Sequence, residues 1–504
     1  MKIKTTTVIV LLVILVAVGY WYLKPKSPKE VLAFKEEQFQ RYCGVCHTVP
    51  DPKNIPKSIW INNVLPEMAA RMGYEYDNNI PVQSSMEERY YVKKSNAYPR
   101  TPMIDSVTWN LIKEYIVNLA PDSIPINPNR KKRNSELTQF SVTLDTASTK
   151  VLDQNLLHVH YNTPTHQFFT SDVFGNLLAV KESKAVTQKF NSPVVSTVLK
   201  DSALYVTEIG AMDPSEVPKG SIYKKDKKNL RLLSKGLHRP VYTQVNDLNE
   251  DSIEEIIICE FGYYTGELSM LVQKDSVFEK KTLSTLPGSI KVEIRDMNGD
   301  GKKDIVALFS QAREGLYILY QQNDLQFNQQ QVISLPPEYG VSWFQMMDYD
   351  KDGDLDVVLA NGDNADYSIF PKPYHGIRLF LNDGSNEFEQ KWFYPIHGAT
   401  RVLAEDFDAD GDIDFAVLAF FVDLLKYPEE GFVYLENKNS KEFLFESFIT
   451  PESKNGNWLV MDKGDFDADG DVDILLGGFS DNLQKTTKLE KGYNHLFLMN
   501  NKAN

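Results

Sequence analysis

Two cysteines and a histidine near the start of the chain have a spacing that could hold a metal or a redox cofactor. Cys43 and Cys46 enclose two small residues, and His47 follows directly. In a C-x-x-C-H pattern, the two thiols can bond to one edge of a porphyrin and the adjacent imidazole can bind the iron. The pattern therefore predicts one covalently bound haem c and, with it, electron transfer.

The pair of cysteines also has two other interpretations. A redox-active dithiol is expected at a strand-to-helix turn, whereas residues 35–42 before the motif favour a helix. A zinc site needs two further ligands, and Cys259, the third and last cysteine, lies far along the chain in an apolar run. Three cysteines also exclude a disulfide scaffold at this length. Haem attachment is the interpretation that the sequence favours.

The sixth ligand of such an iron is open between several residues. Met68 follows His47 by 21 positions, and Met103 lies just before an amphipathic helix predicted for residues 106–119. Methionine is a common partner of histidine at haem iron, but a methionine on an apolar helical face usually belongs to the core. Met68 and Met103 therefore both stay candidates, beside histidine or open coordination. Arg71 is a candidate partner of a haem propionate.

An acidic loop occurs four times in the second half of the chain, with oxygen-bearing side chains at alternate positions and a glycine at the sixth. Such oxygen ligands, brought together by a sharp turn, suit a hard cation such as Ca²⁺. One copy could be a solvated acidic turn, but four matching copies predict about four calcium ions in a structural role. The predicted ligands are Asp296, Asn298, Asp300, Asp304, Asp348, Asp350, Asp352, Asp356, Asp406, Asp408, Asp410, Asp414, Asp465, Asp467, Asp469 and Asp473.

These loops differ from an EF-hand in two respects. The residues after each loop form an apolar β-type run, so the loop leads into a buried strand and not into a helix. The twelfth position, where an EF-hand has glutamate, is apolar. The residues at that position are Ala307, Leu359, Val417 and Leu476.

The spacing of the loops indicates a repeat architecture. A degenerate copy at residues 247–255 precedes the four, and successive copies start 49, 52, 58 and 59 residues apart. Periods of this length are typical of propellers and solenoids. Short apolar runs between turns, with little sign of long helices, predict that residues 140–504 are all-β.

The start of the chain resembles a targeting segment. Residues 8–23 are an uncharged, mainly apolar run that follows Lys2 and Lys4 and ends in Tyr-Trp-Tyr-Leu at residues 20–23. The run lacks a small-residue cleavage site, and Tyr and Trp are typical of a membrane interface. We therefore expect residues 1–26 to be an uncleaved signal-anchor in the cytoplasmic membrane. Because haem c is attached outside that membrane, the rest of the chain is expected on the periplasmic or outer side of a bacterial cell envelope.

Length and composition predict a multidomain, globular chain. The 504 residues are 42% hydrophobic and 12% aromatic, and the formal net charge of −15 argues against nucleic acid as a partner. A helical, cytochrome c-like domain is expected over residues 27–122. A charged linker follows at 123–139, and the β-propeller takes up 140–504.

The acidic loops are similar to the FG-GAP, or VCBS, repeats of integrin-like β-propellers over roughly residues 140–504. Residues 361–368 and 372–376 look further like bacterial FG-GAP repeat proteins that carry a small cytochrome c domain in front. This resemblance implies a propeller behind an all-α haem domain, and a Leu-Pro-x-Met stretch familiar in that family favours Met68. A period near 53 residues gives about seven blades, two of which precede residue 247 and lack the loop.

Two kinds of function follow from these expectations. The first is electron transfer by the haem domain, with the propeller as a platform for a redox partner protein or a small electron donor. The alternative is a haem-linked oxidoreductase, or a propeller that binds or acts on carbohydrate. No nucleophile–base pair, phosphate loop or zinc-protease helix is found.

A few polar residues outside these motifs are weaker candidates for binding. His158, His160 and His166 could bind a metal or the haem, although histidines on a strand are usually plain surface residues. A second polar cluster could bind a ligand at the edge of a blade. Its members are Asp363, Asp366 and His375.

Overall fold

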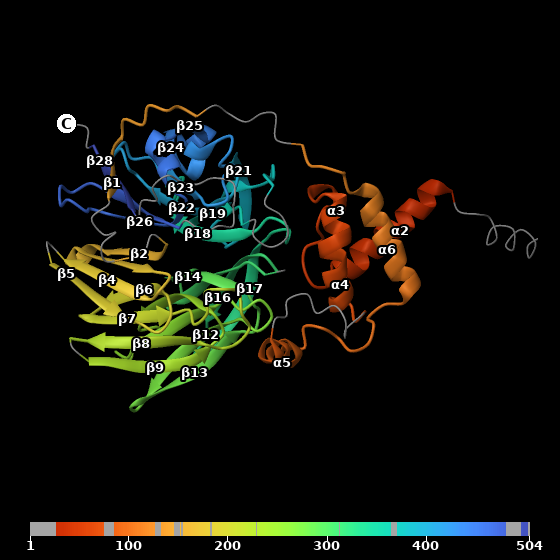
Figure 1. The fold of residues 1–504 in the computed structure, drawn as a ribbon, viewed down its shortest axis with the longest axis horizontal. Coiled ribbons are helices and arrows are strands. Elements are labelled where there is room, and N and C mark those ends of the chain that lie inside the picture. Colours follow the sequence, from red (N-terminus) through yellow and green to blue (C-terminus); the bar gives the residue numbers. More distant parts are fainter. Residues whose placement is uncertain are drawn as a thin grey trace, which may run out of the picture.

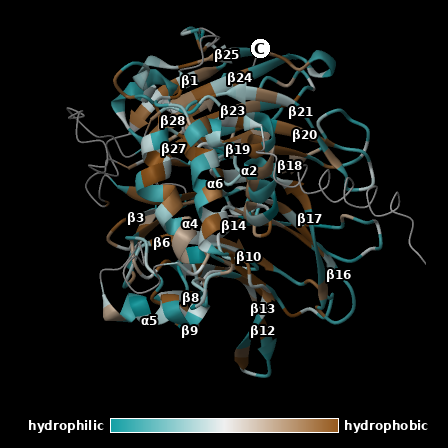
Figure 2. Cartoon of the chain, turned by 90° about the vertical axis from the view of Figure 1, so that its right-hand side faces the viewer, coloured by the Kyte–Doolittle hydropathy of each residue, from teal (hydrophilic) through white to brown (hydrophobic). Residues whose placement is uncertain are grey.

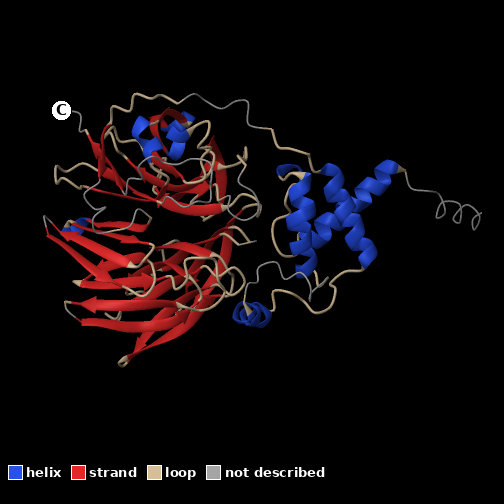
Figure 3. Cartoon of the chain, in the orientation of Figure 1, coloured by secondary structure: helices blue, strands red, loops and turns tan. Residues whose placement is uncertain are grey.

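A computed structural model shows a small helical domain against one face of a seven-bladed β-propeller (Figure 1). Figure 3 colours the chain by secondary structure: the helical domain lies at one side, and the propeller strands, with a few short helical turns among them, lie at the other. The expected fold class, a small helical region before a propeller, is thereby confirmed. The structure describes residues 27–74, 85–125, 133–145, 152, 155–181, 184–227, 229–311, 313–363, 370–479 and 495–501.

Two helices form the frame of the helical domain. In α2 (Pro28–Cys43), the Ser27 and Glu30 side chains each accept a backbone N–H of the other residue, which closes a capping box. In α6 (Ser106–Leu119), Asp105 caps the first turn. The two helices pack together around a shared apolar core. The other helical segments are η1 (Pro52–Asn54), α3 (Lys57–Ile59), η2 (Trp60–Val64), α4 (Leu65–Arg71) and α5 (Met86–Ser95).

Each blade of the propeller is an antiparallel sheet of four strands. Blade 1 is β2 (Leu156–Asn162), β3 (Gln167–Asp172), β4 (Asn176–Lys181) and β5 (Lys184–Lys189). Blade 2 is β6 (Val194–Lys200), β7 (Ala203–Glu208), β8 (Gly220–Asp226) and β9 (Asn229–Leu237). Blade 3 is β10 (Pro240–Asn246), β11 (Glu255–Glu260), β12 (Glu267–Lys274) and β13 (Val277–Ser284).

The next three blades carry the first three acidic loops between their first and second strands. Blade 4 is β14 (Ser289–Arg295), β15 (Asp304–Phe309), β16 (Gly315–Gln321) and β17 (Phe327–Ser334). Blade 5 is β18 (Val341–Met347), β19 (Asp356–Asn361), β20 (Gly376–Asn382) and β21 (Phe388–Pro395). Blade 6 is β22 (Ala399–Glu405), β23 (Asp414–Ala419), β24 (Phe432–Asn439) and β25 (Leu444–Phe448).

The last blade joins the two ends of the propeller. It consists of β26 (Trp458–Gly464), β27 (Asp473–Gly478) and β28 (His495–Asn500), and β1 (Phe140–Asp145) pairs with β28 as its outermost strand. The first strands of neighbouring blades contact one another around the whole ring, which closes it. The predicted number of seven blades is confirmed, and so are the two blades without the acidic loop.

The acidic loops and the helical domain lie on opposite faces of the propeller. Within an antiparallel blade, the turns between strands one and two leave from one face, and the turns between strands two and three leave from the other. The helical domain contacts turns of the second kind, such as those holding Tyr264 and Arg313. Figure 2, seen from the helical side, shows α2, α4 and α6 in front of the middle of the propeller.

The predicted signal-anchor lies outside the described residues. Among the residues that the structure does describe, no helix has the length and apolar character needed to cross a membrane.

Candidate cofactor and metal sites

The C-x-x-C-H motif lies at the C-terminal end of α2, where Cys43 is the last helical residue and His47 follows one turn later. The Nδ1 atom of His47 is 2.8 Å from the carbonyl oxygen of Thr48. Since a carbonyl only accepts, Nδ1 carries the proton and Nε2 keeps its lone pair for a metal. A histidine held in this tautomer by its neighbour fits the axial ligand of a covalently attached haem.

The ionisation of the motif agrees with that fit. Burial lowers the pKa of His47, and Arg71 and Arg313 lower it further, which favours the neutral imidazole that binds metals. Burial raises the pKa of the Cys43 thiol to about 12, with a smaller contribution from Cys46. A redox dithiol needs a thiol that ionises readily. The surroundings of Cys43 therefore argue against a redox-active pair.

The two candidate methionines have different surroundings. Met68, on α4, packs in the same apolar cluster as Cys43. Met103 precedes α6 and is 53% exposed, although its backbone N–H donates to the Met72 carbonyl. The Arg71 guanidinium is engaged with Glu67 at 2.8 Å. Of the two methionines, Met68 thus has the environment of a buried ligand.

A cleft of about 840 Å³ lies between the motif and blades 3 and 4 of the propeller. Its walls carry hydroxyl and amide side chains and one arginine, and they contain no carboxylate. The residues around it are Gly44, Val45, Cys46, His47, Thr48, Thr282, Leu283, Ser284, Thr285, Leu286, Arg313, Tyr317, Gln329, Gln331 and Ser334.

Hydrogen bonds fix the motif against this wall of the propeller. Arg313 Nε donates to the Cys46 carbonyl at 2.7 Å, and the hydroxyls of Thr48 and Ser334 are 2.7 Å apart. The propeller therefore forms one side of the space in front of His47. Sequence reasoning missed Arg313, because no local pattern links it to residues 267 positions away.

A buried polar cluster joins α4 to the propeller beside Met68. Glu67 is only 3% exposed, and its carboxylate is 2.8 Å from Arg71 Nε and 3.0 Å from the Tyr98 hydroxyl. The Tyr98 hydroxyl is also 2.9 Å from that of Tyr264, which comes from blade 3. The Arg71 guanidinium lies over the Tyr264 ring. This cluster fixes the orientation of the helix that carries Met68.

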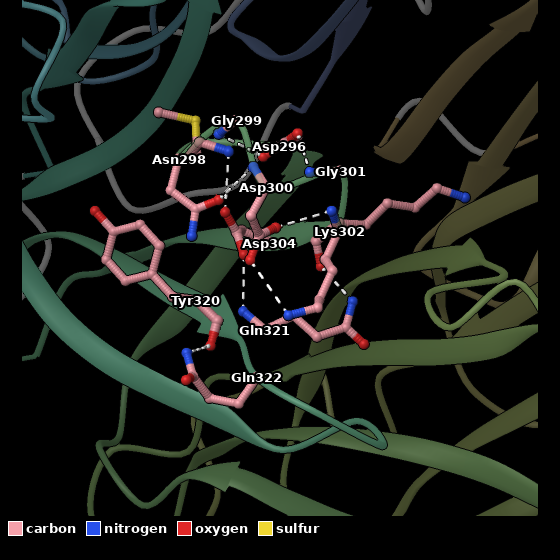
Figure 4. Close-up of polar contacts among 12 residues, drawn as sticks. Asp296, Asn298, Gly299, Asp300, Gly301, Lys302, Asp304, Tyr320, Gln321 and Gln322 are labelled. Carbon is pink, nitrogen blue, oxygen red and sulfur yellow. Dashed lines mark hydrogen bonds and ion pairs between the residues drawn. The ribbon is translucent and has the colours of Figure 1, made fainter.

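The acidic loops share one local geometry, which Figure 4 shows for the first copy. Asp296 accepts the backbone N–H of Gly301 at 2.9 Å, Asn298 accepts that of Asp300 at 3.0 Å, and Asp300 accepts that of Lys302 at 2.9 Å. The first aspartate accepts the N–H of the loop glycine in the other three copies as well. The loop is thus wound around its own oxygen atoms, which face inward.

Three of the loops bring carboxylate oxygens to within 4.8 Å of one another. One oxygen of Asp348 and one of Asp406 are buried there without a hydrogen-bond partner. Buried acceptors without a donor suit a cation, which would supply the missing partner. The first loop lacks such a group of three acids, since Asn298 replaces one carboxylate. The groups are Asp348, Asp350 and Asp356; Asp406, Asp408 and Asp410; and Asp465, Asp467 and Asp473.

The ninth residue of each loop has a second task that the sequence did not reveal. Asp304 accepts the backbone N–H groups of Met297 at 2.9 Å and Gln321 at 2.7 Å, and so ties the loop to the third strand of its blade. These aspartates are fully buried at the start of the second strands. They organise the blade whether or not they also face an ion. The set is Asp304, Asp356, Asp414 and Asp473.

The loop glycine is needed for its backbone conformation. Gly353 has φ +97°, and a Cβ added there would meet no atom within 4 Å. We expect Gly353→Ala to lower the free energy of unfolding by about 1 kcal/mol, because only the left-handed backbone opposes the methyl group. Urea denaturation measures this loss. Lys302→Ala, at a nearby position of another loop, is the control and should change it by less than about 0.5 kcal/mol. Equal effects would contradict the explanation.

The carboxylates predict how stability depends on pH without calcium. Burial raises the pKa of Asp356 to about 6 and that of Asp414 to about 7. The unfolded chain loses these protons near pH 4, so between pH 4 and 7 the folded chain holds more protons. Its melting temperature after chelation should therefore fall as pH rises from 5 to 7.5, and Asp414→Asn should weaken the fall. Saturating Ca²⁺ should reverse the slope. A chelated protein most stable at pH 7.5 would contradict this assignment.

The remaining polar residues singled out from the sequence do not form one site, because they lie in different blades. His158 and His160 lie half-buried on the innermost strand of blade 1, where His158 Nε2 is 2.8 Å from Thr197 Oγ1 of blade 2 and His160 Nδ1 is 3.4 Å from an Asp462 oxygen of blade 7. His375 is fully buried, and burial holds its pKa well below the usual value. Asp366 lies outside the described residues. Cys259 is fully buried in β11, as expected for a small apolar residue.

The fold and its loops define a seven-bladed β-propeller with repeated acidic turns. A family model described as an FG-GAP-like repeat matches residues 296–359, which contain the first two loops. Comparison with curated proteins finds no match.

Two solved structures are similar to this chain. One is the WD40 domain of Neurospora crassa Pan2, at 11% identity over 73% of this chain and 96% of that chain, with a TM-score of 0.43. The other is Saccharomyces cerevisiae Sqt1, at 9% identity over 69% and 84%, with a TM-score of 0.41. Because both TM-scores are low, the number of blades is taken from the seven four-stranded sheets of this chain.

Proposed function

We propose that this chain is a c-type cytochrome whose haem transfers electrons in front of a calcium-binding propeller. The observation that carries the proposal is the position of Cys43, Cys46 and His47. They follow a helix, hold a neutral imidazole with a free Nε2, and face a cleft shared with the propeller. A haem bound there would supply an iron that accepts and donates single electrons.

The residues of the chain have distinct tasks in this proposal. The two cysteines hold the group covalently, and Thr48 orients His47 through its carbonyl oxygen. Arg313 adds a positive charge beside the imidazole, which favours the more reduced state of a site next to it. Met68 is the proposed sixth ligand, since it shares the apolar cluster of Cys43 whereas Met103 is exposed.

We further propose that the acidic loops bind about four calcium ions. Their inward carboxylates, the buried oxygens without partners and the like charges at short range all support a bound cation. Four divalent ions would reduce the formal charge from −15 to −7. Because the loops lie opposite the helical domain, calcium acts on the propeller and not on the haem. The proposal keeps residues 1–26 as a membrane anchor that places both domains on the periplasmic side.

One observation favours a small-molecule donor over a protein partner. The cleft in front of His47 lies between two parts of the chain itself, and its hydroxyl and amide side chains suit a polar molecule. A haem-linked oxidoreductase for a polar substrate, such as a carbohydrate, is therefore the second candidate. Haem reduction by a panel of sugars and alcohols separates it from a simple carrier.

The covalent haem is tested by replacing its attachment residues. In a host that matures haem c, the full chain should give a pyridine-haemochrome spectrum and a haem-stained band on a denaturing gel. Cys43→Ala with Cys46→Ala should abolish the stained band, because no thioether can form. Cys259→Ala is the matched control and should keep it. A full chain without covalent haem would refute the proposal.

A further inference from the structure

All seven innermost strands contain a β-bulge at the same place. The pairing register of each shifts between its first and third residues. A bulge re-aims the side chain that follows it. The strands run away from the face that the helical domain covers, so the third residues form a layer near that face. We call this layer the inner ring: His158, Ser196, Tyr242, Lys291, Trp343, Arg401 and Val460.

Members of the inner ring meet one another across the channel. The rings of Tyr242 and Trp343 are 6.0 Å apart, although their blades are not neighbours. The Arg401 guanidinium lies 4.3 Å from the centre of the Trp343 ring, and the Lys291 ammonium lies 4.6 Å from it. Two cations therefore share one indole in the middle of the propeller.

The positive charge of Arg401 is not paired. Among the described residues, no carboxylate lies within ion-pair distance of it, and its hydrogen bond to the Met461 carbonyl is long, at 3.5 Å. Asp462 attracts Arg401 electrostatically but forms no ion pair with it, and its carboxylate instead accepts the Tyr161 backbone N–H at 2.8 Å and lies 3.4 Å from His160 Nδ1. Burial lowers the pKa of Arg401 to about 10, as expected for a cation short of partners.

The remaining charges do not compensate for Arg401. Lys291 has its own acid, Glu293, at 2.9 Å, and Glu293 also binds Arg295 at 2.8 Å. The Trp343 indole N–H is buried and has no acceptor. An unpaired cation and an unpaired donor side by side are costly to retain unless something binds them.

We propose that the inner ring binds a small carboxylate. The Arg401 guanidinium and the Trp343 N–H donate to its two oxygens, and Lys291 adds attraction. A carboxylate has the planar pair of acceptors that a guanidinium recognises best. Water reaches the ring, since Arg401 and Trp343 are themselves only half-buried. The proposal does not depend on the haem.

Calorimetric titration of the full, calcium-loaded chain with succinate tests the site. Succinate should bind, while the neutral succinamide should not, and sulfate at equal ionic strength should bind at least tenfold more weakly. Arg401→Gln should weaken succinate binding at least tenfold, and Arg401→Lys should weaken it less. Trp343→Phe, which removes one hydrogen bond, should weaken it about tenfold. Arg231→Gln, on the outer strand β9, is the control and should leave it unchanged.

Several results would overturn the proposal. They are the absence of succinate binding, equal affinity in Arg401→Gln, and tighter binding of sulfate, which would indicate a tetrahedral anion. A variant could also fail to bind succinate because its fold is damaged, and a melting experiment separates this case from loss of the site. Succinate should raise the melting temperature of the wild type and leave that of Arg401→Met unchanged. If Arg401 only plugs the channel, Arg401→Met should melt lower and succinate should stabilise neither protein.

Discussion

Met68→Ala is expected to remove the weak red absorption band of a methionine–iron bond and to lower the midpoint potential of the haem. Methionine coordination raises haem potentials, and axial ligands set them over a range of about 0.8 V, so we expect a fall on the order of 0.1 V. Met68 is half-buried and packs against the same apolar cluster of the helical domain as Cys43. Spectroelectrochemical titration measures both effects.

Met103→Ala is the matched control for this experiment. Its side chain is 53% exposed, so both the band and the potential should stay as in the wild type. A loss of the band in Met103→Ala, with Met68→Ala unchanged, would reverse the assignment. Loss in neither variant would indicate histidine or open coordination.

Removal of calcium is expected to have the largest effect on stability. An ion present at a hundred times its dissociation constant contributes about 2.7 kcal/mol per site, provided that it binds only the folded chain. The loops join the first two strands of blades 4 to 7, so chelation should lower the melting temperature of the propeller strongly. Differential scanning calorimetry with and without a chelator measures the change.

A single loop can be tested with a matched pair of variants. Asp408→Asn removes one inward carboxylate of the third loop and should lower both calcium stoichiometry and melting temperature. Asp383→Asn, in an exposed turn where the carboxylate accepts the Ser385 N–H, loses the same charge and should change neither. If chelation leaves the melting temperature unchanged, or both variants behave alike, the ions have no structural role.

The propeller could be predicted because the sequence pattern that indicates it is local and repeated. Each acidic loop carries its own turn, glycine and following apolar run, and the four strands expected after the loops are found as β15, β19, β23 and β27. The period of the loops gave the number of blades, including the two without a loop. The C-x-x-C-H motif is equally local, since Cys43 and His47 lie within one turn, but its predicted haem stays a prediction.

The parts that were missed depend on contacts between distant residues. The sequence contains no signal that Tyr264 meets Glu67, or that Arg313 meets Cys46, because these pairs are joined only when the helical domain docks. The contact of His158 with Thr197 of blade 2 was missed for a similar reason. A strand pattern shows which residues share a face. Whether that face is exposed to solvent or lies against the innermost strands of other blades depends on how the propeller closes.

The pairing of β1 with β28 determines when the propeller can be completed. Phe140 pairs with Asn500, and Asp145 with His495, so the last blade contains the first and the final strands of the ring. During synthesis the helical domain emerges early and can fold, whereas the ring stays open until residue 500 has been made. In the proposed cytochrome, haem attachment can thus precede formation of the cleft wall, which blades 3 and 4 supply.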